Sequence, residues 1–218
     1  MGSKFRFIDL FAGIGGIRIP FEELGGKCVF SSEWDKFSQQ TYEANFKEIP
    51  HGDITKIDAK DIPKHDLLVG GFPCQAFSQA GLKKGFKDTR GTMFFEIARI
   101  LDYHKPKGIL LENVKGLRGH DNGKTFKTII STLNELGYQT IETTVLNAKH
   151  FGLPQNRERI FIVGYLKYQL GFQFPEPPMI ETKVGDILDN DIPDKYTLSD
   201  KIWKGAKSRK EKNRKKGY

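Results

Sequence analysis

The sequence predicts an α/β fold in which a mostly parallel, twisted sheet is covered by helices on both faces. Short apolar runs typical of strands alternate with amphipathic stretches typical of helices, and glycine or polar residues directly follow several of the runs. Alternating strands and helices form right-handed βαβ units. In such a sheet a ligand binds beyond the carboxyl ends of the strands, so we expect the functional residues there.

Each element follows from its local pattern. Strands are expected at residues 5–11, 27–32, 65–70, 107–113, 139–146 and 159–165. Helices are expected at about 15–25, 35–46, 92–104 and 122–137. This pattern indicates one domain over residues 1–170. A proline-bearing linker is expected at 171–195 and a basic segment at 196–218.

Composition narrows the class of protein. The 218 residues contain no apolar run long enough to cross a membrane, and the N-terminus lacks the apolar region of a signal peptide. Two cysteines and five scattered histidines offer no disulfide framework and no metal-ligand spacing. We therefore expect a cytoplasmic protein with no membrane partner and no metal.

The net charge of +8 is concentrated at the C-terminus. Nine of the 35 Lys and Arg residues lie in 201–218, against one of the 27 acidic residues, so the first 200 residues are neutral overall. A basic segment of this kind can bind phosphates. A solvated helix or a disordered end is an equal alternative.

Three segments at expected strand ends suggest a cofactor site. The first strand runs into DLFAGIGG, where a glycine turn lets the backbone approach a ligand, although a plain tight turn is as probable. The second ends in SEWD, where Glu33 stands where nucleotide-binding folds hold ribose hydroxyls and Trp34 could stack on a purine. Alternatively, Asp35 caps a helix and Trp34 lies in the core. GDIT places Asp53 and Ile54 at the next expected strand end, or in a simple turn. Together they indicate an adenosine-containing cofactor.

A further segment carries a thiol and leads into a predicted loop. In GGFPCQ, Cys74 follows the glycine pair and Pro73, which suits an accessible nucleophile, whereas Cys28 suits a buried strand position. The glycine-rich, basic stretch 81–92 is typical of a loop that closes over a substrate.

In LENVKG, Glu112 emerges from an apolar strand, where partial desolvation favours acid catalysis. In PQNRER, Arg157 and Arg159 are expected on one strand face, pointing at the pocket. A surface ion pair through Glu158 is the alternative.

The motifs, in this order and spacing, closely resemble those of the C5-cytosine DNA methyltransferases. They are DLFAGIGG, SEWD, GDIT, GFPCQAFSQAG, ENV and QNRER, and they cover about residues 5–165. The resemblance implies a Rossmann-like fold that uses S-adenosylmethionine and releases S-adenosylhomocysteine. It also implies base flipping in double-stranded DNA and methylation of cytosine C5, in a bacterial or phage restriction–modification system.

The resemblance also implies a role for each residue. The catalytic group is Cys74, which adds to cytosine C6, with Glu112 at N3, Arg159 as support and Arg157 assisting. The cofactor would be held by Phe11, Gly13, Gly15, Gly16, Glu33, Trp34, Asp53, Ile54, Phe72 and Pro73. Gln75, Ser78 and Asn113 would contact the substrate, and the loop 78–91 would close on the flipped base.

Nothing in residues 166–218 resembles the family's final Gly-Asn segment. The stretch from Tyr196 onward resembles the entry to a target-recognition region. We therefore expect a split or truncated enzyme, with a second chain as a possible partner. Two alternatives stay open: a tRNA cytosine methyltransferase, and a non-catalytic fragment that needs a partner.

Overall fold

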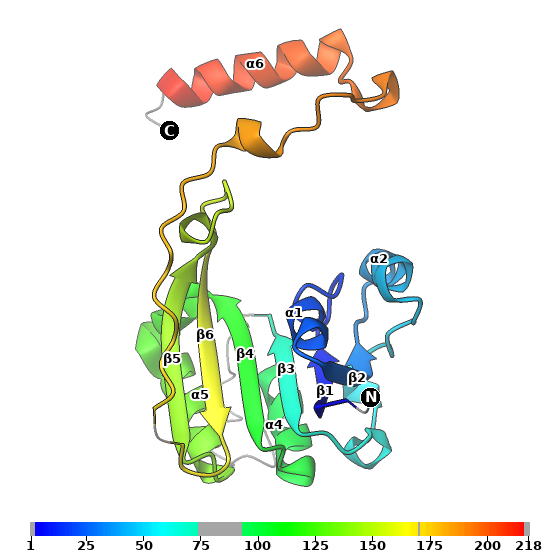
Figure 1. Cartoon of the computed structure of the whole chain (residues 1–218). Helices are drawn as coiled ribbons and strands as arrows, with labels where there is room; N and C mark the ends of the chain where they lie inside the picture. Colours follow the sequence, from blue (N-terminus) through cyan, green and yellow to red (C-terminus); the bar gives the residue numbers. More distant parts are fainter. Residues whose placement is uncertain (1–2, 74–92, 170, 216–218) are drawn as a thin grey trace.

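The protein is built on one six-stranded sheet, seen in the computed structural model of Figure 1. The structure describes residues 3–73, 93–169 and 171–215. The strands are β1 (Phe5–Leu10), β2 (Gly26–Ser32), β3 (Leu67–Gly71), β4 (Gly108–Val114), β5 (Thr140–Asn147) and β6 (Glu158–Tyr165). The sheet order is β2-β1-β3-β4-β6-β5. All six predicted strands are present, with ends that differ by at most two residues.

The sheet is mostly parallel, as predicted, with β6 as the strand that runs the other way. Strands β1 to β4 pair in parallel, whereas β6 pairs antiparallel with both β4 and β5. Arg159 lies opposite Val114, the last residue of β4. The first residues of β6 therefore lie at the edge where the parallel strands end.

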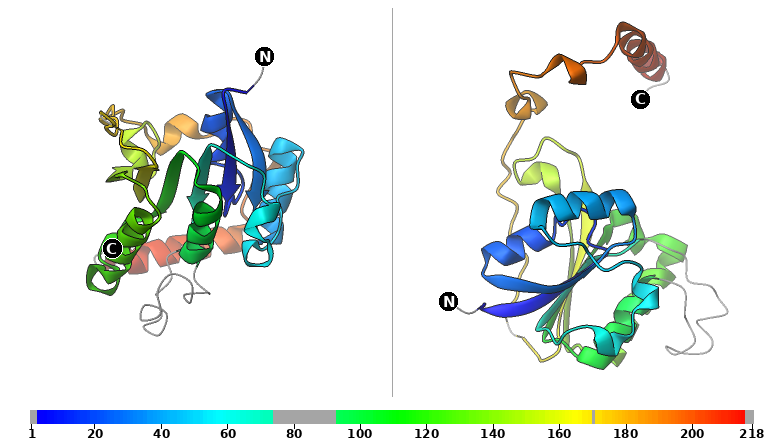
Figure 2. Two further views of the ribbon diagram at one scale, coloured as in Figure 1. Left: turned by 90° about the horizontal axis from the view of Figure 1, so that it is seen from below. Right: turned by 90° about the vertical axis from the view of Figure 1, so that its right-hand side faces the viewer.

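Helices cover both faces of the sheet, as predicted (Figure 2, right). On one face, α4 (Met93–His104) and α5 (Lys124–Glu135) bury Ile97, Leu101, Ile129 and Leu133 against Ile8 and Leu10 of β1 and its neighbours. On the other, α1 (Arg18–Glu23) packs Phe21 against Phe7, Cys28 and Val69. Neighbouring residues of a strand point to opposite faces, which divides the apolar residues of β1 between the two cores.

One predicted strand end is wrong. The segment before Asp53 forms an isolated bridge between His51 and Ser32, and Asp53 then caps the short 3-10 helix η1 (Ile54–Lys56). His51 nevertheless follows the end of β2 closely, because its N–H bonds to Ser31 O and its carbonyl accepts from Glu33 N–H. This pairing brings Asp53 to the same sheet edge without a full strand.

The chain after β6 leaves the sheet. Residues 171–199 are mostly exposed, touch the body where Ile180 bridges Phe151, and include the 3-10 turns η7 (Val184–Ile187) and η8 (Asp194–Tyr196). They lead to α6 (Asp200–Lys215), which stands beyond the carboxyl edge of the sheet (Figure 1). Among the described helices, none combines the length and apolarity that crossing a membrane requires.

Two buried titratable groups have pKa values moved in opposite directions. Asp9 of β1 is fully buried, and its carboxyl oxygens find no hydrogen-bond partner among the described residues. Burial raises the pKa of Asp9 to about 7, and attraction to Arg18 only partly opposes this effect. Burial lowers the pKa of His65 to about 4, although its Nδ1 bonds to Pro63 O.

These shifts predict opposing pH dependences of stability. Asp9 takes up a proton more readily in the folded state, so its contribution to the free energy of unfolding falls as pH rises from about 4 to about 7. His65 resists protonation in the folded state, so its contribution falls as pH drops from about 6.5 to about 4. The two slopes partly cancel in the wild-type protein.

Replacing Asp9 with Asn should reveal how the Asp9 contribution to the free energy of unfolding depends on pH. The free energy of unfolding of Asp9→Asn, minus that of wild type, is expected to rise with pH between 5 and 7. The slope should approach ~1.4 kcal/mol per pH unit and level off above pH 8. Urea unfolding at four pH values measures it, with exposed Asp102→Asn as the control for lost charge. A difference that stays constant with pH would contradict the assignment.

Candidate active site

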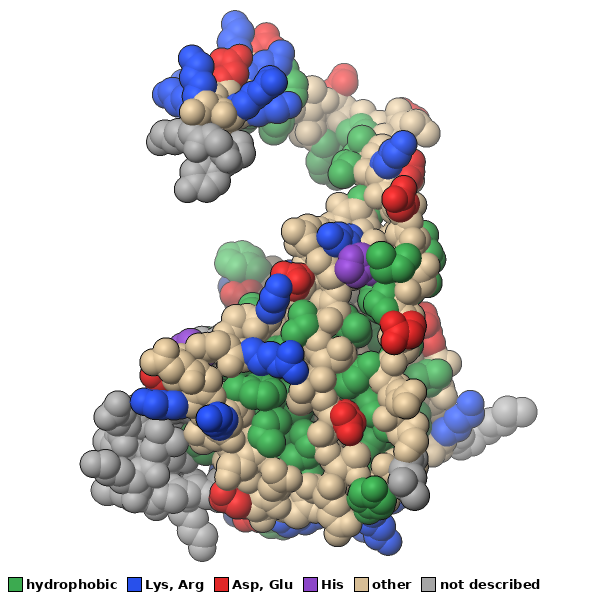
Figure 3. Space-filling view, turned by 90° about the vertical axis from the view of Figure 1, so that its left-hand side faces the viewer, with side chains coloured by type: hydrophobic (Ala, Val, Ile, Leu, Met, Phe, Trp, Pro, Cys, Tyr) green, Lys and Arg blue, Asp and Glu red, His purple; other side chains and the backbone are tan. Residues whose placement is uncertain are grey.

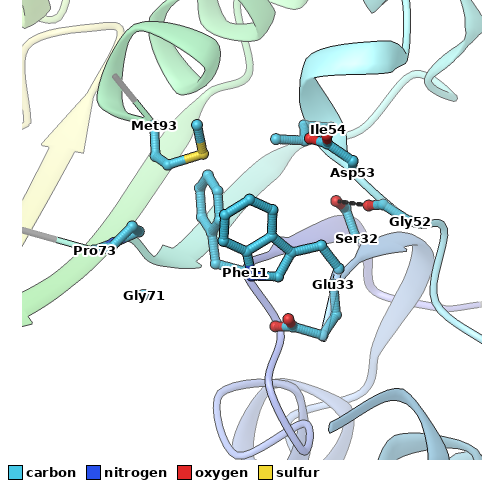
Figure 4. A pocket seen from close by; sticks show the side chains of 10 residues that line it. Phe11, Ser32, Glu33, Gly52, Asp53, Ile54, Gly71, Pro73 and Met93 are labelled. Atoms are coloured by element: carbon cyan, nitrogen blue, oxygen red, sulfur yellow. Dashed lines mark hydrogen bonds between the residues drawn. The ribbon is translucent and has the colours of Figure 1, made fainter. Parts of the chain in front are cut away.

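A cavity of about 250 Å³ lies at the carboxyl edge of the sheet. Figure 4 shows side chains converging on it from the ends of β1, β2 and β3, the segment before η1, and the start of α4. Its lining residues are Phe11, Ser32, Glu33, Trp34, Gly52, Asp53, Ile54, Gly71, Pro73 and Met93. Six of the ten predicted cofactor residues are therefore brought together here.

The other four predicted cofactor residues lie outside the lining of the cavity. Phe72 is buried in the core against the ring of Phe94. Gly13 and Gly15 have positive φ angles of 55° and 91°, and a Cβ at Gly15 would collide with the ring of Phe46 on α2 (Lys36–Phe46). Gly16 has open space around its Cα and no unusual φ. The glycine turn thus needs Gly15 both for its backbone and for close packing.

Glu33 is held rigidly at this cavity. Its Oε2 accepts the N–H of Gly13 and its Oε1 accepts the N–H of Asp35, each at 2.8 Å. Each carboxylate oxygen keeps another lone pair for a ligand hydroxyl. The glycine turn and the end of β2 are therefore joined through the acid that the sequence singles out.

The alternative for SEWD is half correct. Asp35 does cap α2, because its Oδ1 accepts from Ser38 N–H at 2.8 Å. Trp34, however, is 67% exposed and lines the cavity, so it does not belong to the core.

Asp53 acts both as a turn former and as a lining residue. Its Oδ1 accepts from the backbone N–H and the hydroxyl of Thr55, at 3.0 and 2.8 Å. These bonds lower the pKa of Asp53 below its ordinary value, so the side chain faces the cavity edge as a carboxylate.

Beside the cavity, Glu112 of β4 pairs with Arg159 of β6. Oε1 of Glu112 lies 2.7 Å from Nε of Arg159, and both side chains are about one fifth exposed. On the other side, Oε2 would lie 3.2 Å from a Cβ at Gly71, so the lack of a side chain there makes room for the carboxylate. Glu112 is thus held between the strand that leads to Pro73 and the reversed strand β6.

Glu158 does form an ion pair, as the alternative for this segment supposed, but its partner is neither Arg157 nor Arg159. The Glu158 carboxylate pairs with Lys115, at 2.9 Å, whereas Arg159 reaches only the backbone carbonyl of Glu158 and forms its ion pair with Glu112. Arg157 comes just before β6 and is exposed. Only one of the two arginines therefore lies in the strand.

Asn113 has a structural use that its motif does not reveal. The side chain is 2% exposed. Its Nδ2 donates to Phe72 O at 2.9 Å, and its Oδ1 accepts from Val114 N–H at 2.8 Å. These bonds tie the end of β4 to the residue before Pro73 and support a positioning role. Direct substrate contact by Asn113 stays a prediction.

Several predicted residues lie outside the part of the chain that the structure describes: Cys74, Gln75, Ser78 and the loop 78–91. Conversely, the predicted cofactor residues did not include Ser32, Gly52, Gly71 and Met93 of the lining. Ser32 and Gly52 adjoin predicted residues, but nothing in the sequence around Met93 marks it. Among the described residues no group of His, Cys, Asp and Glu could hold a metal ion.

A parallel sheet with a glycine turn, an acid after its second strand and a cavity at its carboxyl edge defines a Rossmann-like α/β protein of the cofactor-binding class. The chain belongs to the C-5 cytosine-specific DNA methylase family, which it matches over residues 5–218.

Known relatives agree with this assignment. The chain is 58% identical over 218 residues to the Type II methyltransferase M.DsaV of Dactylococcopsis salina, covering 99% of this chain and 62% of that protein. It is 59% identical over 220 residues to M1.ScrFI of Lactococcus lactis subsp. cremoris, covering 99% and 56%. The chain thus spans about six tenths of the length of these relatives.

The fold also resembles that of a solved structure, the DNMT2 of Spodoptera frugiperda. The TM-score is 0.73 at 23% identity, covering 93% of this chain and 65% of that one. At this identity the likeness concerns the fold alone.

Proposed function

We propose that this chain forms the cofactor-binding and catalytic part of a DNA (cytosine-5-)-methyltransferase that uses S-adenosylmethionine and releases S-adenosylhomocysteine. One observation supports this most strongly: the Glu112–Arg159 pair lies beside the cavity, against the strand that leads to Pro73 and Cys74. A polar pair suited to a nucleobase, a cavity suited to a cofactor, and Pro73, which precedes Cys74 in the sequence, thus lie at one sheet edge.

The cavity suits the nucleoside end of the cofactor. Its volume is slightly below the range of about 300–1,000 Å³ typical of ligand pockets, but it is partly open, so a longer ligand can extend along it. Glu33 would accept the ribose hydroxyls, Trp34 would stack on the adenine, and Asp53 would accept from its amino group. Phe11, Ile54, Pro73 and Met93 supply apolar contact. When bound, S-adenosylmethionine supplies an electrophilic methyl group.

The residues of this chain would activate the cytosine for that transfer. The Cys74 thiolate adds to C6, while the Glu112 carboxyl holds or protonates N3 and draws electrons from the ring. Arg159 keeps Glu112 in place through their ion pair. After C5 takes the methyl group, a base removes the C5 proton and the thiolate leaves C6. The target cytosine must leave the duplex to reach this sheet edge, which implies base flipping.

The relatives support DNA as the substrate. The family that the chain matches is described as a DNA methylase, and the relatives that are 58–59% identical are named Type II methyltransferases. We therefore propose a place in a restriction–modification system, in the bacterial cytoplasm, for an enzyme of bacterial or phage origin. A second chain as partner stays a prediction.

A covalent trap tests the function. With the natural full-length protein, S-adenosylmethionine and DNA carrying 5-fluorocytosine, we expect a protein–DNA adduct on a denaturing gel. Fluorine at C5 cannot be removed as a proton, so Cys74 stays bonded to C6. Cys74→Ser should give no adduct. Trapping on 5-fluorocytosine tRNA alone would favour the RNA alternative, and no adduct on either would refute the proposal.

A crossed pair of variants separates catalysis from cofactor binding. Glu112→Gln should slow methyl transfer at least about 100-fold, while the cofactor Kd stays within about threefold. Glu33→Gln should weaken the cofactor Kd about tenfold or more, because a neutral amide accepts hydrogen bonds less strongly. Calorimetry gives Kd, and single-turnover rates at saturating cofactor give the transfer step. Equal losses in both quantities for Glu112→Gln would contradict its role.

Helix α6 offers a surface for the DNA backbone. Figure 3 shows Lys and Arg gathered on the helix at the top of the view, and all the described residues of α6 are exposed. At 100° per residue, four lysines fall within about 80° of one another around the axis, and no acid lies among them. They are Lys201, Lys204, Lys212 and Lys215.

If this face meets phosphates, its charge should control the salt dependence of DNA binding. Changing the four lysines to Gln should reduce the slope of log K against log salt by about 3–4. The matched Lys→Arg variant keeps the charge and should keep the slope. Fluorescence titrations of the full-length protein at several salt concentrations measure it. Equal slopes in the Gln variant and wild type would exclude the contact.

A further inference from the structure

Asn147, the last residue of β5, joins both ends of the loop 148–157 that leads to β6. Its side chain is buried and makes three hydrogen bonds. Oδ1 accepts from the N–H groups of Lys149, at 3.2 Å, and Arg157, at 3.1 Å. Nδ2 donates to Oδ1 of Asn156 at 2.7 Å. One amide thus fixes the first turn and the last two residues of the loop.

The backbone of Arg157 depends on this arrangement. Its N–H bonds to Asn147 Oδ1, and its carbonyl accepts from Ala148 N–H at 3.0 Å. Other backbone bonds in the loop are local, such as those from Phe151 to Ala148 and from Gln155 to Leu153. Although Arg157 lies outside the β6 ladder, its backbone N–H and carbonyl are therefore both hydrogen-bonded, as in a strand.

The side chain of Arg157 has a different character from that of its neighbour. Arg159 is bound to Glu112, whereas the guanidinium of Arg157 is exposed and makes no hydrogen bond or ion pair with the residues that the structure describes. A fixed backbone with an unengaged guanidinium is suited to meeting an anion from outside.

We infer that Asn147 is a positioning residue that fixes Arg157 so that its guanidinium meets a phosphate of the bound DNA. This inference rests on the proposed function for the identity of the anion. The residue type fits the task, because one amide oxygen has two lone pairs for two N–H groups and the amide nitrogen still has a proton to donate. Ala would lose all three bonds. Asp at this position would keep the two hydrogen bonds that Oδ1 accepts. The third bond could form again if the side-chain amide of Asn156 turned so that its NH2 group donates to the new carboxylate.

A double-mutant cycle in the full-length protein tests this role. Asn147→Ala should raise the KM for DNA about tenfold, leave the KM for S-adenosylmethionine within twofold, and be largely rescued in Asn147→Asp. Arg157→Ala should show a similar loss. The double variant should be no worse than Arg157→Ala within about twofold, because both changes remove the same contact. Losses that multiply in the double variant would overturn the inference.

Amide hydrogen exchange supplies a readout that does not depend on activity. In Asn147→Ala the amides of Lys149 and Arg157 should exchange at least about tenfold faster, and in Asn147→Asp they should stay protected. Unchanged protection in Asn147→Ala would overturn the inference, as would faster exchange without a rise in the KM for DNA. If wild type does not methylate DNA, the proposed function fails, while exchange still decides whether Asn147 fixes Arg157.

Asp58→Ala is the matched control. Asp58 caps the 3-10 helix η2 (Ala59–Asp61) as Asn147 caps η6 (Ala148–His150), by accepting from the second residue of the turn, but it has no link to Arg157. Asp58→Ala should change neither the KM for DNA nor the KM for S-adenosylmethionine. If Asn147→Ala does not fold, the Asp variant and Arg157→Ala carry the test. If the rise in the KM for DNA caused by Asn147→Asp then multiplied that of Arg157→Ala in the double variant, the result would count against positioning.

Discussion

The reversal of β6 is the constraint on which the active edge depends. Five strands run one way, so their carboxyl ends gather the glycine turn, Glu33, Pro73 and Glu112 at one edge. A sixth strand in the same direction would bring only its own last residues there. Because β6 runs the other way between β4 and β5, its first residues reach that edge, and Arg159 meets Glu112.

Much of this arrangement could be predicted from sequence, because strand patterns and motif spacing are local properties. The six strands and the cavity acid Glu33 follow from short segments, whereas the sequence left open whether Trp34 is exposed or lies in the core. The direction of β6 does not, because the loop 148–157 gives no sign of whether the chain crosses over or turns back. Asp53 reached its predicted edge by pairing of His51 with β2, a long-range contact that no local pattern contains. Met93 lines the cavity only because α4 begins beside it.

Charged groups at the edge are held by the protein before any ligand arrives. Glu33 takes two backbone N–H groups, Asp53 is bonded to Thr55, and Glu112 is paired with Arg159. Fixed carboxylates need little reorganisation when a hydroxyl or a base approaches, which is the basis of electrostatic preorganisation. Asp9 differs, because its carboxyl is buried and finds no hydrogen-bond partner among the described residues. The fold tolerates this cost two residues before Phe11, where the backbone must leave β1 for the cavity.

Two asparagines, at the ends of different strands, each bind a neighbouring segment through the side-chain amide. Asn113 joins the end of β4 to Phe72, and Asn147 joins the end of β5 to the segment before β6. In each case a strand end must hold a neighbouring segment that carries a proposed functional residue, Cys74 in one and Arg157 in the other. A buried amide can donate and accept at once without bringing a charge into a poorly solvated place. In the sequence an asparagine only favours a turn or a cap, so this use of the side chain becomes visible only when the two segments are seen together.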